Sequence, residues 1–276
     1  MAPTPDRSYT FDHRLVDAET VTFACSSDVG EWPWLAMAPT HPAAINAQSF
    51  WTSIGASRAR ETLEEEKWSA MTWTKWQCDN PDVGHAVRGT YSGGREDGKL
   101  AFETLLYDDL DRLIVKIDGQ GVIFRTRDFE AWRARAKQQT KNGPDLTDFE
   151  FAAPSLLGLS ECEHPFISPL QGTDQRSLQG LITQANGLLP GNPYWGGSGD
   201  HVNTTHFAEL ARQTLCLLHG GAPVAITMGE MDMHRYIELG AVIDVRIDRF
   251  RPGQLNLILG QSERDCASVA LQFQPG

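Results

Sequence analysis

The chain has 276 residues, of which 41% are hydrophobic and 9% aromatic, so it is long enough to bury one large core or two ordinary ones. Its formal net charge of −12 at pH 7 argues against a surface that binds nucleic acid or an anionic membrane. No stretch approaches the roughly 18 consecutive apolar residues of a membrane span, and no cationic start leads into an apolar run. We therefore expect a cytoplasmic protein with no nucleic-acid or membrane partner.

The cysteines support the same compartment. They are five in number, far apart, and include no CxxC pair, which is typical of free thiols in a reducing environment. The cysteines are Cys25, Cys78, Cys162, Cys216 and Cys266.

The pattern of the N-terminal half predicts one helix followed by several strands. The helix is expected over residues 41–66, with Pro42 in its first turn. The strand-like runs that follow are separated by the turn-forming sequences SGGREDG and YDDLD. These runs are residues 69–77, 85–91, 99–107 and 112–129.

The C-terminal half repeats this order. Apolar residues recur at helical spacing from Phe207 to Leu218, which predicts a helix from about Thr204 to Leu218, and the glycines of HGG directly after it indicate its end. Apolar residues then alternate with polar ones, which predicts an antiparallel meander of about four strands. Its clearest strands are residues 241–250, 255–260 and 265–273.

Two copies of a helix followed by an antiparallel meander predict an α+β chain with a duplicated architecture. A long helix wrapped by a curved antiparallel sheet is the hotdog arrangement, so the expected fold class is a double hotdog. We place the N-terminal hotdog at residues 1–137, a linker at 138–160 and the C-terminal hotdog at 161–276. A single α+β domain of other topology is the alternative. Because two hotdogs in one chain already satisfy the usual pairing, we expect a monomer or a homodimer.

Polar residues lie along one side of the C-terminal helix. In GDHVNTTHFAELARQ, Glu209 and Gln213 are four residues apart and share a face, and Arg212 lies three residues after Glu209. Because a hotdog helix is wrapped by its sheet, we expect the Glu209 carboxyl to be desolvated, which favours its protonated form. The alternatives are an exposed ion pair with Arg212 or a buried pair that serves packing.

The segment HFAELARQTL resembles the central helix of hotdog enzymes that act on acyl thioesters. DHV…ELARQ is similar to the helix of the AfsA-type proteins of A-factor biosynthesis. The spacing of Glu209 and Gln213 is similar to the acid-xxx-Gln element of polyketide synthase dehydratase domains, whose N-terminal hotdog supplies a histidine ahead of its helix. His41 takes that place in APTHPAAIN. The chain departs from these patterns: a glycine and a proline are missing after His41, Glu209 replaces an aspartate, and the first helix lacks the acid-Arg-Gln signature.

The resemblance implies an enzyme that dehydrates or hydrates an acyl thioester, carried by CoA or an acyl carrier protein, in natural-product or fatty-acid-like biosynthesis. His41 would take the α-proton, Glu209 would protonate the departing hydroxyl, and Gln213 would orient Glu209 or the hydroxyl. We expect no cofactor. We also expect no metal, because His201, His206 and His219 lack the usual spacing of metal ligands with an acid. The alternatives are a thioesterase, an AfsA-type acyltransferase and a non-catalytic lipid- or polyketide-binding protein. In a thioesterase, Glu209 would activate water or act as nucleophile, and Asn203 or His201 would position the substrate.

Five further residues are secondary candidates: His201, Asn203, Arg212, Trp34 and Trp51. His201 could replace His41 as the base. Asn203 is expected to cap the helix, and Arg212 to form an ion pair.

Two tryptophans and a basic run have two interpretations each. Trp34 and Trp51 belong to a tryptophan-rich segment, for which we expect packing in the core or at a subunit interface. An apolar tunnel for an acyl chain or an aromatic substrate is the alternative. The basic run at residues 125–137 could receive a carrier protein or a phosphopantetheine, or could be a solvated face.

Overall fold

The computed structural model describes residues 8–63, 69–80, 82–96, 99–123, 129–140, 143–159, 163–186 and 201–275. It contains two compact units, Met1–Arg125 and Thr126–Gly276. This division differs from the expected boundary at residue 137, because helix α2 (Phe129–Gln139) and the expected linker belong to the second unit. No helix within the described ranges is long and apolar enough to cross a membrane.

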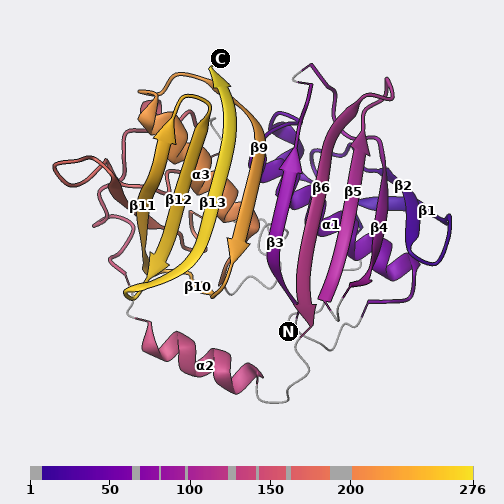
Figure 1. Ribbon diagram of the computed structural model, residues 1–276, viewed down its shortest axis with the longest axis horizontal. Coiled ribbons are helices and arrows are strands. Elements are labelled where there is room, and N and C mark those ends of the chain that lie inside the picture. Colours follow the sequence, from indigo (N-terminus) through magenta and orange to yellow (C-terminus); the bar gives the residue numbers. More distant parts are fainter. Residues whose placement is uncertain are drawn as a thin grey trace. The chain divides into compact units, whose positions relative to one another are not determined.

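The first unit packs helix α1 (Pro42–Ala59) against six antiparallel strands (Figure 1). Their order in the sheet is β1-β2-β4-β5-β6-β3. The four expected strands are present, but β4 includes the residues SGGRE that were expected to form a turn. The helix begins at Pro42, near its expected start, and ends at Ala59, before the expected end at residue 66. Two strands before the helix were missed, although Val21, Phe23 and Cys25 alternate as buried residues in the second of them. The strands are β1 (Thr10–Leu15), β2 (Thr20–Cys25), β3 (Ser69–Gln77), β4 (Arg88–Glu96), β5 (Lys99–Tyr107) and β6 (Leu113–Ile123), with a 3-10 helix at Pro33–Ala36.

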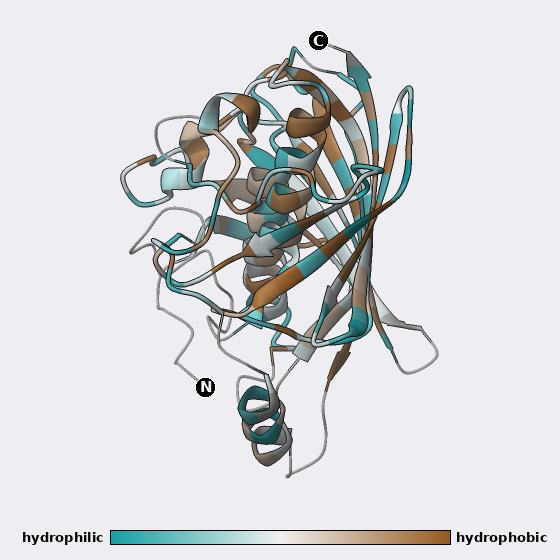
Figure 2. Ribbon diagram, turned by 90° about the vertical axis from the view of Figure 1, so that its left-hand side faces the viewer, coloured by the Kyte–Doolittle hydropathy of each residue, from teal (hydrophilic) through white to brown (hydrophobic). Residues whose placement is uncertain are grey.

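The second unit repeats the arrangement with helix α3 (Thr204–Leu218), which has the bounds that its periodicity predicts. Its main sheet is antiparallel with the order β9-β13-β12-β11-β7, and β8 pairs with β10 in a separate ladder. The strands alternate between hydrophobic and hydrophilic residues along their length, as the meander requires (Figure 2). The strands are β7 (Ser177–Leu181), β8 (His201–Val202), β9 (Val224–Met233), β10 (Ile237–Glu238), β11 (Val242–Arg251), β12 (Gln254–Gln261) and β13 (Arg264–Pro275), with a 3-10 helix at Pro154–Leu156.

Trp34 and Trp51 pack in the core of the first unit. Trp34 has no exposed surface and Trp51 is 3% exposed. Trp34 meets the Tyr9 ring edge-on, with ring centroids 4.8 Å apart, and Trp51 meets Trp32 in the same way at 5.0 Å. The expectation of core packing is therefore confirmed for these tryptophans, whereas Trp68 lies outside the described residues.

The described cysteines are free thiols, as expected from their spacing. They are Cys25, Cys78, Cys216 and Cys266, while Cys162 lies outside the described residues. Burial raises the pKa of both Cys25 and Cys78 to about 12, so these two thiols remain protonated at neutral pH.

Helix α1 approaches its sheet closely because its buried face carries small residues. At Gly55 a methyl group would lie 2.0 Å from Thr10 Oγ1 and 3.0 Å from His13 Nε2, so only glycine fits against β1. Thr10 Oγ1 is itself 3.0 Å from His13 Nε2, which fixes the side chain that fills this space.

We expect Gly55→Ala to destabilise the protein by about 1–3 kcal/mol through overpacking, although alanine normally favours a helix over glycine. The free energy of unfolding from denaturant titration measures this effect. In a Thr10→Ala background the obstructing hydroxyl is gone, so the same change should cost much less. Equal costs in the two backgrounds would contradict the contact.

Candidate active site

The first turn of α3 is closed by a reciprocal pair of hydrogen bonds. Asn203 Oδ1 accepts from the backbone N–H groups of Thr205 at 3.1 Å and His206 at 3.4 Å. In return, the Asn203 N–H donates to His206 Nδ1 at 3.2 Å. This is a capping box in which histidine stands where glutamate or glutamine is common. The expected capping role of Asn203 is confirmed.

His206 is held as a neutral ring. Its burial, together with the charge of His201, lowers the pKa of His206 to about 3. Because Nδ1 accepts a hydrogen bond, we assign the ring proton to Nε2. His206 therefore supports the helix start and does not exchange protons near neutral pH.

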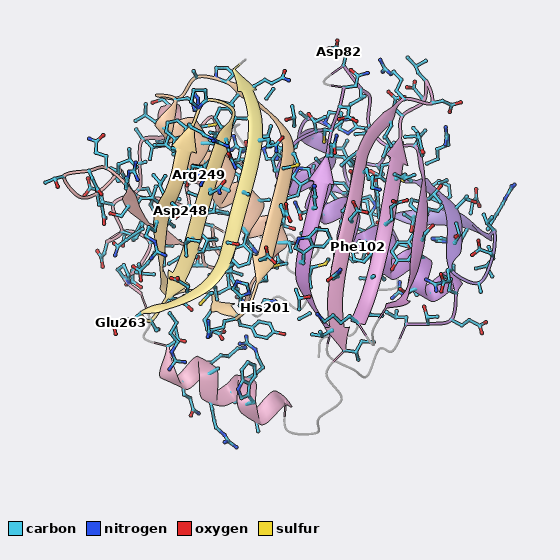
Figure 3. The ribbon with its side chains drawn as sticks, viewed as in Figure 1. Asp82, Phe102, His201, Asp248, Arg249 and Glu263 are labelled. Atoms are coloured by element: carbon cyan, nitrogen blue, oxygen red, sulfur yellow. The ribbon has the colours of Figure 1, made fainter. Side chains whose placement is uncertain are left out.

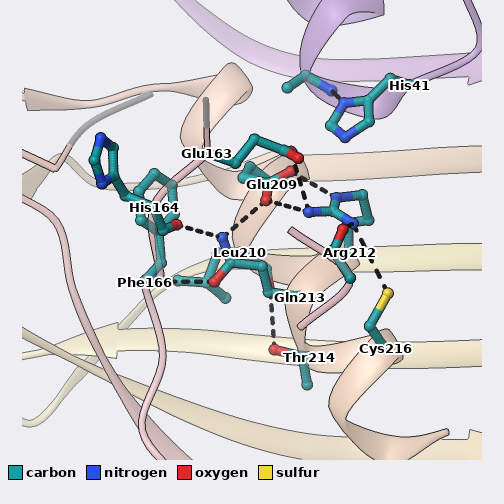
Figure 4. Close-up of polar contacts among 12 residues, drawn as sticks. His41, Glu163, His164, Phe166, Glu209, Leu210, Arg212, Gln213, Thr214 and Cys216 are labelled. Carbon is teal, nitrogen blue, oxygen red and sulfur yellow. Dashed lines mark hydrogen bonds and ion pairs between the residues drawn. The ribbon is translucent and has the colours of Figure 1, made fainter. Parts of the chain in front are cut away.

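One turn further along, Glu209 is fully buried and accepts three hydrogen bonds (Figure 4). Arg212 donates from Nε to Oε2 at 2.8 Å and from Nη2 to Oε1 at 2.7 Å. Gln213 Nε2 donates to Oε1 at 2.8 Å. The expected desolvation of the carboxyl is present, and its pairing with Arg212 is buried, so the alternative of an exposed ion pair is wrong.

Arg212 serves two carboxylates at once. Besides Glu209, its Nη2 lies 3.2 Å from Glu163 Oε1, and its Nη1 donates to the Gly158 carbonyl at 2.9 Å. Burial alone would lower the pKa of Arg212, but the two carboxylates raise it above its usual range, so the guanidinium stays charged. The Glu163 side chain is only 4% exposed. The sequence carried no signal for Glu163, because it lies in an irregular segment 49 residues before Arg212.

Gln213 connects the same segment to the helix. Its Nε2 donates to the His164 carbonyl at 2.9 Å as well as to Glu209, and its Oε1 accepts from the Phe166 N–H at 2.8 Å. These bonds fix the orientation of the Gln213 carboxamide, and with it the direction from which Gln213 Nε2 meets Glu209 Oε1. Gln213 orients Glu209, one of the tasks that the sequence predicts for it.

His201 lies in β8, three residues before the first residue of α3, and is half-buried. Its ring meets Tyr236 edge-on with centroids 4.7 Å apart. His201 and Asn203 therefore flank the start of the helix that carries Glu209, and the second unit brings together most of the predicted site residues.

His41, Trp34 and Trp51 belong to the first unit. His41 is the N-cap of α1, and its Nδ1 accepts from the Ala43 N–H at 3.2 Å. Its pairing with Glu209 stays a prediction, as does the lining of an acyl-chain tunnel by the two tryptophans.

No protein-family model matches the sequence, and no curated protein matches it. Solved structures are similar over nearly the whole chain. The 12:0-ACP thioesterase from Umbellularia californica is 11% identical with a TM-score of 0.56, over 95% of this chain and 100% of that one. An acyl-ACP thioesterase from Bacteroides thetaiotaomicron is 10% identical with a TM-score of 0.54, over 92% and 97%. A protein of unknown function with a hot dog fold from Alicyclobacillus acidocaldarius is 10% identical with a TM-score of 0.54, over 96% and 95%.

The fold is a double hotdog. The helix and sheet of each unit supply one hotdog, and the fold class predicted from the repeated pattern is confirmed. In the second hotdog, the buried polar cluster sits on the central helix and bonds to Gly158, Glu163, His164 and Phe166 of the preceding segment.

We expect the neutral His206 to make stability depend on pH. Its folded-state pKa is depressed, so the unfolded chain binds a proton below pH 6.5 that the folded chain refuses down to about pH 3. This histidine alone should lower the free energy of unfolding by about 1.4 kcal/mol per pH unit in that window. His206→Gln keeps a capping side chain without titrating.

The measurement is denaturant unfolding of both proteins from pH 7 to pH 4. As the pH falls, the free energy of unfolding of the wild type should decrease more than that of His206→Gln. His234→Gln, which changes an exposed histidine, is the matched control and should leave the pH dependence unchanged. Parallel curves for the wild type and His206→Gln would contradict the assignment.

Proposed function

We propose that this double hotdog hydrolyses acyl thioesters and that Glu209 is the carboxylate that activates water. The observation that carries the proposal is the set of three hydrogen bonds that both Glu209 oxygens accept from Arg212 and Gln213. A general acid has to donate a proton, whereas a base or nucleophile has to present oxygen lone pairs. Donors on both oxygens favour the second task.

The contacts of His41 point away from dehydration as well. Dehydration needs a histidine whose ring nitrogen can take the α-proton. His41 Nδ1 already accepts the Ala43 N–H, so the neutral ring carries its proton on Nε2 and offers a donor there. Hydrolysis with Glu209 as base requires no such histidine, and we therefore prefer it to the dehydratase assignment.

The proposed reaction has two steps. Glu209 takes a proton from a water molecule as the water oxygen attacks the thioester carbonyl carbon, which gives a tetrahedral oxyanion. The C–S bond then breaks, and the proton passes from Glu209 to the departing thiolate, so that a free acid and a free thiol result. Arg212 and Gln213 keep the carboxylate oriented, and the positive end of α3 together with His201 and Asn203 would position the thioester.

The similar solved structures support this substrate class. Two of them are named for thioesterase activity, one on a 12:0-ACP and one on an acyl-ACP. We accordingly propose an acyl thioester of CoA or of a carrier protein as the substrate, and a cytoplasmic location, which agrees with the free thiols of the described cysteines.

The test is release of free thiol from acyl-CoA and acyl carrier protein thioesters of graded chain length, followed with a thiol reagent. We expect Glu209→Gln to lower kcat by roughly 100-fold or more with little change in KM, because it removes the base and keeps the shape. Asp248→Asn changes an exposed carboxylate on β11 and should leave hydrolysis unchanged (Figure 3).

A second variant separates chemistry from folding. Glu209→Gln leaves Arg212 with Glu163 as its carboxylate partner, and a loss of folding would show in thermal unfolding. Glu209→Asp keeps the charge, but its side chain is one methylene shorter and moves the carboxylate away from the water that it would activate. This variant should fold and still lose most activity. Full activity in both variants would refute the role of Glu209. Dehydration of a 3-hydroxyacyl thioester by the wild type, without release of thiol, would restore the dehydratase assignment.

A further inference from the structure

Helix α2 contacts the second hotdog through the buried Arg133 and through the exposed Trp132, whose ring meets the Tyr236 ring edge-on with centroids 6.1 Å apart. Of its described side chains between residues 131 and 138, Arg133 is buried and the others are exposed or, for Ala136, half-buried. A surface helix normally packs through an apolar stripe. Here a charged residue takes the inward position, which calls for a specific explanation.

Arg133 binds β10 and the residue before it in two ways. Its Nη1 and Nη2 donate to the two carboxylate oxygens of Glu238, the second bond being 2.9 Å long. Its guanidinium also lies over the Tyr236 ring, 4.2 Å from the centroid. The side chains of Arg133 and Glu238 are 5% and 9% exposed. Lysine cannot replace arginine here, because only the planar guanidinium can bond both carboxylate oxygens and stack on an aromatic ring at the same time.

The other contacts of this region make β10 a fixed platform. Gln261 Oε1 accepts the Glu238 N–H at 2.8 Å, and Gln261 Nε2 donates to the Glu238 carbonyl at 3.1 Å. The chain after α2 returns to the same place, where the Gly143 N–H donates to the Gly240 carbonyl at 2.7 Å. The segment that contains α2 is thus tied to β10 and its following turn at two points.

Strand β10 pairs with β8, which contains His201 of the candidate active site. In the ladder of β10 with β8, Glu238 is opposite His201. Arg133 covers the Tyr236 ring, and the Tyr236 ring in turn meets the His201 ring. Asn203, the N-cap of α3, lies two residues after His201 in the chain. Figure 3 shows side chains of α2 reaching toward the part of the unit where His201 is labelled.

We propose that Arg133 is a positioning residue that fixes His201 and the capped start of α3. The proposal rests on the proposed function insofar as these groups position the thioester. A buried ion pair adds little net stability compared with apolar packing, so geometry explains this one better than stability does. Through Arg133, helix α2 supports the proposed site although it contributes no catalytic residue.

The experiment compares Arg133→Met with Arg135→Met, which removes an exposed arginine from the same helix. Amide hydrogen exchange is measured for peptides that cover residues 201–207, and the His201 ring protons are followed by NMR. We expect Arg133→Met to raise exchange in this segment at least tenfold and to move the His201 signals, because the Tyr236 ring loses its cation. Arg135→Met should match the wild type in both measurements.

Kinetics provide the functional readout. With an acyl thioester that the wild type hydrolyses, Arg133→Met should raise KM about tenfold with a smaller change in kcat, and Arg133→Lys should recover only part of the loss. If Arg133→Met fails to fold, Glu238→Gln weakens the same contact without removing the arginine and should give the same local exchange.

Unchanged exchange and unchanged His201 signals in Arg133→Met overturn the inference, whatever the activity. Faster exchange with an unchanged KM overturns the functional part of it. Absence of hydrolysis in the wild type, together with the expected exchange and NMR effects, refutes the proposed thioesterase and supports the positioning of His201 by Arg133.

Discussion

The rest of the second hotdog depends on how α3 neutralises the charges that it buries. A carboxylate in the core is costly unless it is paired and hydrogen-bonded. Glu209 meets this requirement with Arg212 and Gln213 from its own helix. Arg212 in turn binds Glu163 and the Gly158 carbonyl, so the chain that precedes the sheet has to lie against the helix. The arginine that pairs with the buried Glu209 therefore also holds Gly158 and Glu163 against the helix.

The two central helices solve the problem of burial differently. In α1 two of the buried polar side chains bond within the helix: Asn46 Nδ2 donates to the Pro42 carbonyl at 2.9 Å and Thr52 Oγ1 to the Ser49 carbonyl at 3.1 Å. These bonds use up their donors locally. In α3 the polar side chains bond to each other and to another part of the chain. The second arrangement holds a carboxylate in a fixed direction away from water, which is what acid–base chemistry requires.

The chemistry of such a carboxylate is decided by its partners and not by its place on the fold. Hotdog folds serve many reactions, so the fold by itself selects none. Glu209 would suit dehydration if its neighbours accepted hydrogen bonds. Because Arg212 and Gln213 donate them, we propose hydrolysis instead. Capping residues show the same dependence. The sequence suggests His41 as a proton carrier, yet its Nδ1 atom accepts a backbone N–H at a helix start, as the Nδ1 atom of His206 does in α3.

The sequence by itself determined the features that arise from neighbours along the chain. Periodicity placed α3 and the C-terminal meander, and the i+3 and i+4 spacing placed Arg212 and Gln213 beside Glu209, because a helix brings such residues onto one face. Only the tertiary structure decided which distant groups complete the network. Glu163 lies 49 residues from Arg212, and Arg133 lies 105 residues from Glu238. No local pattern encodes such pairs, because they form only when packing of the sheet and helix closes the intervening chain and removes both charges from water.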